Sequence, residues 1–183
     1  MRAATVAVFA LCLSCARTAN VEPLAPTFPA DTVPSVTPIF VDSAFDASTR
    51  SEIEESIDFW NYALHGYRVL YLAGVLQNPL GAALPANAWT ITFNETAPPP
   101  PEIVEGAIAW VTAVGSGEIH LTPNGEKLGV ILHEMGHSLG LGHLAGTVMD
   151  PVDSGKDCLD LETLSVLAAV SGWDWRTLRP TCQ

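Results

Sequence analysis

Three of the five histidines of this chain lie within eleven residues, in the stretch HEMGHSLGLGH that begins at residue 133. His133 and His137 are four positions apart, so on a helix of 3.6 residues per turn they project from one face, about 6 Å apart along the axis. Imidazole is the commonest metal ligand among side chains, and a buried histidine without a partner is costly. The pair therefore predicts a site for one metal ion.

A third histidine follows after a glycine. In an unbroken helix His143 would lie about 9 Å beyond His137 along the axis and could not reach the same ion. Gly140 stands where the chain must bend, and glycine enters the left-handed conformation without a Cβ penalty. Gly142 adds a second permissive position. We therefore expect the helix to end near Gly140 and the chain to bring His143 back to the ion.

Glu134 directly follows the first of these histidines. It is turned about 100° from His133 around the helix, so its carboxylate can flank the ion without ligating it. Three neutral imidazoles leave a zinc ion its full charge and one open position, which lowers the pKa of a bound water toward about 7. Glu134 can then take a proton from this activated water and later give one to a leaving amine. The pattern indicates hydrolysis with Glu134 as general base.

The complete pattern is H-E-x-x-H-x-x-G-x-x-H, followed six residues later by Met149 in the stretch TVMDP. It resembles the metzincin zinc peptidases, most nearly their matrixin-like branch. The resemblance implies that His133, His137 and His143 bind one zinc ion and that Met149 forms a floor beneath them in a Met-turn. It also implies an α+β fold of the metzincin-type zincin class, with an α/β-like upper subdomain. In that fold a small twisted mixed sheet carries an active-site helix, and a C-terminal helix follows the Met-turn.

The resemblance also suggests where a substrate binds. A peptidase must hold an extended peptide, and pairing its backbone with an exposed strand edge is a simple way to do so. In metzincins this edge is the strand that here matches GAIAWVTA, residues 106–113. We therefore expect Ala109, Trp110 and Val111 to lend backbone groups to a protein or peptide substrate.

The remaining histidines and a group of acids do not predict further metal sites. His65 and His120 each stand alone, and a surface or edge-strand role is expected for both. His120 is the one residue that matches the structural zinc site of matrixins, and their glycine-rich calcium loop has no counterpart here. A second zinc or a structural calcium is therefore not supported. Four acids lack EF-hand spacing and are interpreted as turn and capping residues: Asp150, Asp153, Asp157 and Asp160.

Apolar spacing predicts five strands and three helices, an α+β or α/β layout. The strands are expected at residues 37–45, 67–72, 88–94, 106–113 and 117–123, with a loop at 97–102. The helices are expected at residues 49–64, at the histidine segment and at 160–170, the last ending at Ser171-Gly172. The histidine-bearing helix is expected to be capped by Thr122 or Asn124, with Glu126 in its first turn.

The first sixteen residues have the layout of a secretory or lipoprotein signal: Arg2, an apolar run at residues 3–13, then small residues. Cleavage could follow Ala16, or precede Cys15 as in a lipobox, which would make Cys15 a lipid anchor. Residues 17–36 read as a proline-rich linker and residues 37–183 as the catalytic domain. The protein is thus expected to be secreted, or anchored on the extracytoplasmic side of a membrane.

Cys158 and Cys182 are the two cysteines that lie clearly within the predicted catalytic domain. In an exported protein such a pair reads first as a disulfide, with two buried thiols as the alternative.

The charge balance narrows the function classes. Eight basic against twenty acidic residues give a net charge of −12, which would repel nucleic acid and an anionic membrane surface. We therefore expect an exported, monomeric zinc endopeptidase. The alternative is a non-catalytic zinc-binding module, which would fill the fourth metal position with a protein ligand and would have no need of Glu134.

Overall fold

The computed structural model describes residues 34–95, 107–152 and 155–182. Several predictions lie outside the described residues: the signal with its candidate lipidation site Cys15, most of the proline-rich linker, the loop at 97–102, and Asp153. Within them the chain forms, in order, β1 (Ser35–Asp42), α1 (Ala47–Leu64), β2 (Arg68–Leu76), β3 (Trp89–Phe93), β4 (Ala109–Val111), β5 (Glu118–Leu121), α2 (Leu128–Ser138) and α3 (Leu161–Ser171). Two short 3-10 turns, η1 (Pro79–Gly81) and η2 (Trp175–Thr177), complete the elements.

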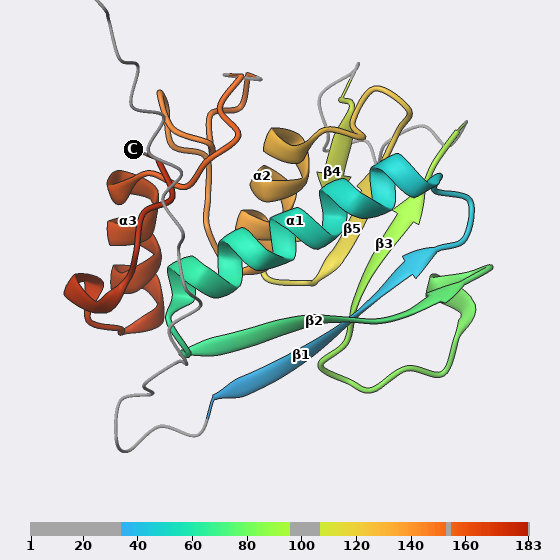
Figure 1. Cartoon of the computed structure of the whole chain (residues 1–183), viewed down its shortest axis with the longest axis horizontal. Coiled ribbons are helices and arrows are strands. Elements are labelled where there is room, and N and C mark those ends of the chain that lie inside the picture. The colour runs from blue at the N-terminus through green and yellow to red at the C-terminus, as the bar shows by residue number, and fades with distance from the viewer. Residues whose placement is uncertain (1–33, 96–106, 153–154, 183) are drawn as a thin grey trace, which may run out of the picture.

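The strands form one five-stranded mixed sheet in the order β2-β1-β3-β5-β4. All neighbouring pairs are parallel except β4 with β5, which is antiparallel. Both α1 and α2 lie on the same side of this sheet, as Figure 1 shows. The prediction of a mixed α+β architecture is therefore confirmed.

The core lies between these helices and the sheet. Successive side chains of a strand point to opposite faces, so every second residue of a strand faces the helices. Ile39 and Val41 of β1 are fully buried, as are Ile119 and Leu121 of β5. Trp60 of α1 is also fully buried, and its Nε1 donates a hydrogen bond to the Leu132 carbonyl of α2 at 3.2 Å. The first helix thus fixes the second, histidine-bearing helix against the sheet.

Helix α1 begins two residues earlier than predicted, with Asp46 as its N-cap. The Asp46 carboxylate accepts a hydrogen bond from the backbone N–H of Thr49 at 2.8 Å, the usual way in which an aspartate satisfies an N-terminal donor. Helix α3 begins and ends as predicted: Asp160 accepts from Thr163 N–H at 2.8 Å, and Gly172 ends it in the left-handed conformation.

The predicted start of α2 is wrong. The helix begins only at Leu128, with Lys127 as a cap that makes no side-chain hydrogen bond. Thr122 instead donates to the carbonyl of Ile108 at 2.7 Å, next to β4. Glu126 accepts from the hydroxyl of Thr49 at 2.8 Å and so binds α1. Tertiary contacts therefore hold residues 122–126 in turns, and neither Thr122 nor Asn124 is a cap.

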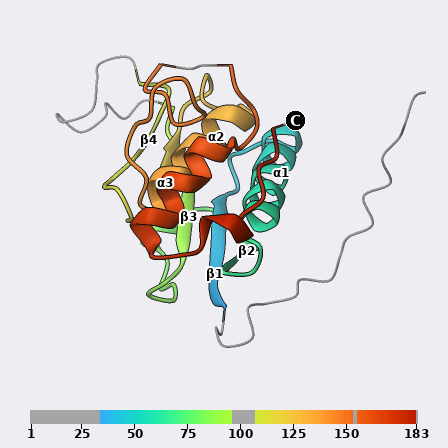
Figure 2. The same ribbon diagram turned by 90° about the vertical axis from the view of Figure 1, so that its left-hand side faces the viewer.

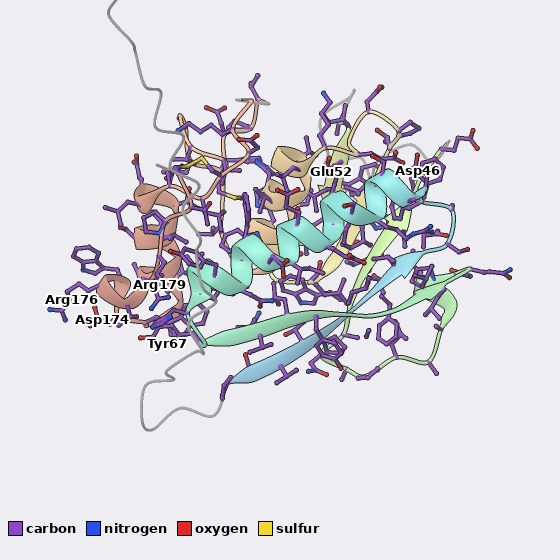
Figure 3. All side chains as sticks on the ribbon, viewed as in Figure 1. Asp46, Glu52, Tyr67, Asp174, Arg176 and Arg179 are labelled. Atoms are coloured by element: carbon purple, nitrogen blue, oxygen red, sulfur yellow. A yellow bond between two sulfur atoms is a disulfide. The ribbon has the colours of Figure 1, made fainter. Side chains whose placement is uncertain are left out.

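The C-terminal segment crosses from α3 to the end of α1. Figure 2 looks from the α3 side and shows this passage. Arg179 N–H donates to the carbonyl of Ala63 at 3.1 Å, and the rings of Tyr67 and Trp173 stack at 4.9 Å. Figure 3 labels Tyr67 and Arg179 at this end of α1.

Among the described residues, no helix is both long and apolar enough to cross a membrane.

Candidate metal centre and active site

The three predicted histidines meet at one point. His133 and His137 project from α2, and their ring centroids are 4.6 Å apart. His143 comes from the segment beyond the helix, with its centroid 5.4 Å from His133 and 4.8 Å from His137. One ligand atom from each of the three lies within 4.8 Å of the others. Among the described residues, this is the one group of three or more histidine, cysteine or acidic side chains that could hold a metal ion.

Gly140 makes the bend that brings His143 back. Its φ is +100°, in the region that favours glycine. Gly140 N–H donates to the His137 carbonyl at 2.9 Å, and Leu141 N–H donates to the Gly136 carbonyl at 3.0 Å. These two bonds form a Schellman motif, which ends a helix and satisfies its last carbonyls. The predicted bend is confirmed, but Gly142 does not have a positive φ, so the second permissive position is not used.

Backbone carbonyls fix the tautomer of the two helical histidines. His133 Nδ1 lies 2.8 Å from the Val148 carbonyl, and His137 Nδ1 lies 2.7 Å from the Leu141 carbonyl. A carbonyl only accepts, so each Nδ1 carries the proton and each Nε2 keeps its lone pair. Such an outer hydrogen bond is how proteins orient histidines that ligate metals. The donor set therefore fits zinc, for which neutral imidazole is a standard ligand.

Met149 lies directly against the histidine-bearing helix. It is fully buried, and its sulfur occupies the place where a side chain on Gly136 would begin. The turn that carries it is internally bonded: Leu144 N–H donates to the Met149 carbonyl at 2.8 Å, and Met149 N–H donates to the Thr147 hydroxyl at 3.0 Å. The turn thus presents Val148 and Met149 to the helix together, one to His133 and the other to Gly136.

Glu134 is a buried acid, and no described residue forms an ion pair with it. Glu134 is 5% exposed, and within the described part of the chain its Oε2 has no hydrogen-bond partner. Burial raises the pKa of Glu134 to about 8, and burial also lowers the pKa of His137 to about 4. In both residues burial disfavours the charged form of the side chain. A bound cation would lower the pKa of the Glu134 carboxyl again, because it favours the carboxylate. An unpartnered buried polar atom calls for such an explanation.

The predicted substrate strand is at the edge of the sheet. Among the described strands β4 pairs only with β5, in the register Ala109–Leu121, Trp110–His120 and Val111–Ile119. Thr112 N–H donates to the Glu118 carbonyl at 3.0 Å. Since bonded and non-bonded pairs alternate in an antiparallel ladder, Trp110–His120 is also a bonded pair.

It follows that the three strand residues are not equivalent. The backbone groups of Ala109 and Val111 point away from β5, to the open edge, whereas those of Trp110 are used within the sheet. Because the register pairs Trp110 with His120, Ala109 and Val111 are the residues whose backbone groups face the edge, and the pairing of this strand with a substrate stays a prediction. Beyond β4, Gly115 N–H donates to the His137 carbonyl at 2.8 Å, which ties the strand's end to the histidine cluster.

The two lone histidines lie apart from the cluster. His65 ends α1 with φ +45°, and its Nε2 is 3.2 Å from the Arg179 guanidinium. His120 is only 8% exposed and lies on β5, the strand inside the edge. The surface or edge-strand role predicted for His120 is wrong, because the sheet order places β4 outside it.

Cys158 and Cys182 form a disulfide with an S–S distance of 2.05 Å, seen as a yellow bond in Figure 3. Beside it, Leu159 and Thr181 exchange two hydrogen bonds, from Leu159 N–H to Thr181 Oγ1 at 2.7 Å and from Thr181 N–H to the Leu159 carbonyl at 2.8 Å. The chain end is thereby fastened to the segment that follows the Met149 turn.

Sequence reasoning missed the residues that orient the ligands. The carbonyls of Leu141 and Val148 leave no trace in residue type, because every residue has a carbonyl. The close contact at Gly136 could have been predicted from the sequence. A glycine inside a helix costs stability, so one within HEMGH indicates a close approach by another segment.

No protein-family model and no curated protein matches this sequence. The solved structures that are similar in part include the following two. One is titled as the structure of a chaperone-substrate complex, with 15% identity and a TM-score of 0.43 over 64% of this chain and 25% of that chain. The other is high choriolytic enzyme 1 from medaka fish (Oryzias latipes), a hatching enzyme zinc-protease, with 17% identity and a TM-score of 0.36.

The second alignment covers 59% of this chain and 44% of the fish enzyme. This chain therefore spans less than half the length of either neighbour. Overlaps this partial carry no argument about shared activity, and the function has to be argued from the residues of the site.

Proposed function

We propose that this protein is a zinc-dependent endopeptidase of the metzincin type, with the fold that this class implies. One observation carries the proposal: ligand atoms of three histidines, two of them held by backbone carbonyls, converge at one point, and the residue after His133 on α2 is a buried acid whose Oε2 has no hydrogen-bond partner among the described residues. A cation at this point would satisfy the imidazoles and offset the burial of Glu134. A cluster with a purely structural role would not need three converging imidazoles or a buried Glu134 without a hydrogen-bond partner on Oε2.

In this proposal His133, His137 and His143 hold one zinc ion, which when bound supplies Lewis acidity to the scissile carbonyl and to a water. The Glu134 carboxylate would accept the proton of the attacking water as its oxygen bonds to the carbonyl carbon, and would then deliver that proton to the peptide nitrogen as the C–N bond breaks. Burial suits this role, because a desolvated carboxylate holds a proton more strongly than a solvated one.

The open edge of β4 would hold the substrate. Ala109 and Val111 each offer an outward N–H and carbonyl, the groups with which an extended peptide pairs. The bond from Gly115, four residues beyond β4, to the His137 carbonyl links the segment after this edge to the helix that carries two of the proposed ligands, which supports this arrangement. A peptide aligned along β4 would thus be delivered to the histidine cluster, which favours an endopeptidase that binds several residues of its substrate.

Export is part of the proposal. The Cys158–Cys182 disulfide supports an oxidising compartment, where such bonds persist. Whether the protein is free or anchored through Cys15 can be decided by growth with labelled fatty acid. Label on the wild type and none on Cys15→Ser would establish the anchor, and an unlabelled wild type would exclude it.

Substitution of the base tests the proposal. Glu134→Gln should retain one zinc ion per chain and the wild-type melting temperature, while hydrolysis of casein falls by several orders of magnitude. Glu126→Gln is the matched control, since that carboxylate binds Thr49 away from the ligands and should leave activity unchanged.

The same experiment addresses the non-catalytic alternative. A zinc-binding module would show stoichiometric zinc and no chelator-sensitive digestion of casein or gelatin by the wild type. Turnover by Glu134→Gln above about a tenth of the wild-type value would contradict the role given to this residue.

A further inference from the structure

His120 is buried on the face of the sheet that faces away from α2. Its strand neighbours Ile119 and Leu121 belong to the apolar core under the helices, so His120 points to the opposite face. Trp110, its partner across the ladder, is also buried but does not belong to that core. The two residues form a separate small cluster on the outer face, at the edge proposed to bind substrate.

Both ring nitrogens of His120 have partners. Nδ1 lies 2.8 Å from Asn94 Nδ2 and 2.8 Å from Thr92 Oγ1, which come from β3 and the residue after it. Nε2 lies 3.2 Å from Glu118 Oε1 and 3.3 Å from Thr112 Oγ1. The Asn94 amide nitrogen donates to Nδ1, and Nε2–H donates a hydrogen bond to the Glu118 carboxylate. The imidazole is neutral and bonded on both sides.

Two of the contacts reach the edge strand. The Trp110 ring stacks on the His120 ring at 5.0 Å with an interplanar angle of 11°. Thr112, the residue after β4, contacts Nε2 on the same face. β4 is three residues long and, among the described strands, has a neighbour on one side, so these two contacts help to set its orientation on this face. His120 thus links β4 to Thr92 and Asn94, across β5.

We propose that His120 is a positioning residue for substrate binding, holding β4 in the orientation that an extended peptide requires. This inference rests on the proposed peptidase function. Trp110 lies between Ala109 and Val111, so a tilt of Trp110 turns the outward N–H and carbonyl groups on both sides of it. The proposed zinc ligands and Glu134 are carried by α2 and the segment that follows it, whereas the imidazole of His120 lies on the opposite face of the sheet. Its loss should therefore weaken binding of peptides that pair with β4 and leave the chemical step unchanged.

Substrate length separates this role from a general structural one. We compare a peptide of about ten residues, which can pair with β4, with a short blocked peptide that reaches only the cluster. His120→Ala should raise KM for the long peptide about tenfold, with kcat within twofold of wild type. For the short peptide kcat/KM should stay within twofold of wild type. His65→Gln, the other lone histidine, is the control and should behave as wild type with both peptides.

Two further variants keep the test decisive if His120→Ala does not fold. Thr112→Val removes one contact to Nε2, and His120→Phe keeps a ring against Trp110 while it removes the polar contacts. Each should raise KM for the long peptide by a smaller factor than His120→Ala. Unchanged KM values in the folded variants would overturn the inference, as would a loss of zinc or an equal effect on both peptides. A wild type without activity would instead overturn the proposed function.

Discussion

The sulfur of Met149 lies in the space that a Cβ would need at Gly136. This contact joins the turn after the third histidine to the helix that carries the first two. The same turn supplies the Val148 carbonyl that fixes His133. The position of Met149 against the helix and the orientation of the His133 ring are therefore connected through one turn.

Gly136→Ala should accordingly damage the metal centre through packing alone. An added methyl group would displace the buried Met149, at a cost of about 1–3 kcal/mol in the free energy of unfolding. We expect a lower melting temperature and weaker zinc binding, measured by calorimetry and by competition with a chromophoric chelator. Gly142→Ala is the matched control, because a Cβ there meets nothing within 4 Å and its φ is not positive. Equal effects of the two substitutions would show that the Met149 contact is unimportant.

A proline scan of β4 tests the assignment of its two edges. Ala109→Pro and Val111→Pro remove N–H groups that face the open edge, so KM for a long peptide should rise while melting temperature and zinc content change little. Trp110→Pro removes a donor to β5 and should lower the melting temperature instead. If Ala109→Pro and Val111→Pro both bind a peptide hydroxamate as tightly as wild type, substrate does not pair with β4.

The burial of His120 predicts a dependence of stability on pH. Burial lowers the pKa of His120 below its ordinary 6.5, and the facing Glu118 carboxylate only partly opposes this shift. The unfolded chain therefore takes up this proton at a higher pH than the folded chain. The contribution to stability is complete above pH 6.5 and is lost as the pH falls from there toward the folded pKa.

Urea unfolding at pH 7.5 and pH 5 can measure this contribution. The wild type should lose more stability over this interval than His120→Gln, and the difference isolates His120 because both proteins share His137 and the other titrating groups. Identical losses would mean that His120 titrates alike in the folded and unfolded chains.

The disulfide should contribute substantially to stability. Cys158 and Cys182 are 24 residues apart, and closing a loop of this length in the unfolded chain is worth about 3 kcal/mol in the chain-entropy treatment. Replacing both with serine should lower the free energy of unfolding by about 2–4 kcal/mol. Adding a reductant should lower the melting temperature of the wild type and leave that of the double-serine variant unaltered. If complete reduction left the melting temperature of the wild type unchanged, the disulfide would not contribute to stability.

Much of this molecule followed from the sequence because it depends on short-range geometry. Four-residue spacing puts His133 and His137 on one helix face whatever surrounds them. Gly140 permits the left-handed turn that returns His143, because this is a property of glycine itself. The five strands and α1 likewise followed from apolar periodicity, with boundaries that shifted by a few residues.

The start of α2 did not follow, because long-range bonds compete with local capping. Thr122 and Glu126 are good residues for a helix start, but their side chains are bound to Ile108 and Thr49, far away in the sequence. Local preference predicts what a segment does alone, and tertiary contacts worth a similar free energy can override it.

The sequence by itself determined the histidine cluster, the acid beside it and the bend, because residue type and helical period carry that information. Only the tertiary structure decided which backbone groups orient these histidines and which ones face the edge of the sheet. The carbonyls that orient His133 and His137, the outward face of Ala109 and Val111, and the burial of His120 all depend on register and on the order of strands in the sheet. Every residue carries the same backbone groups, so their use is set by where the chain passes and not by which side chain they bear.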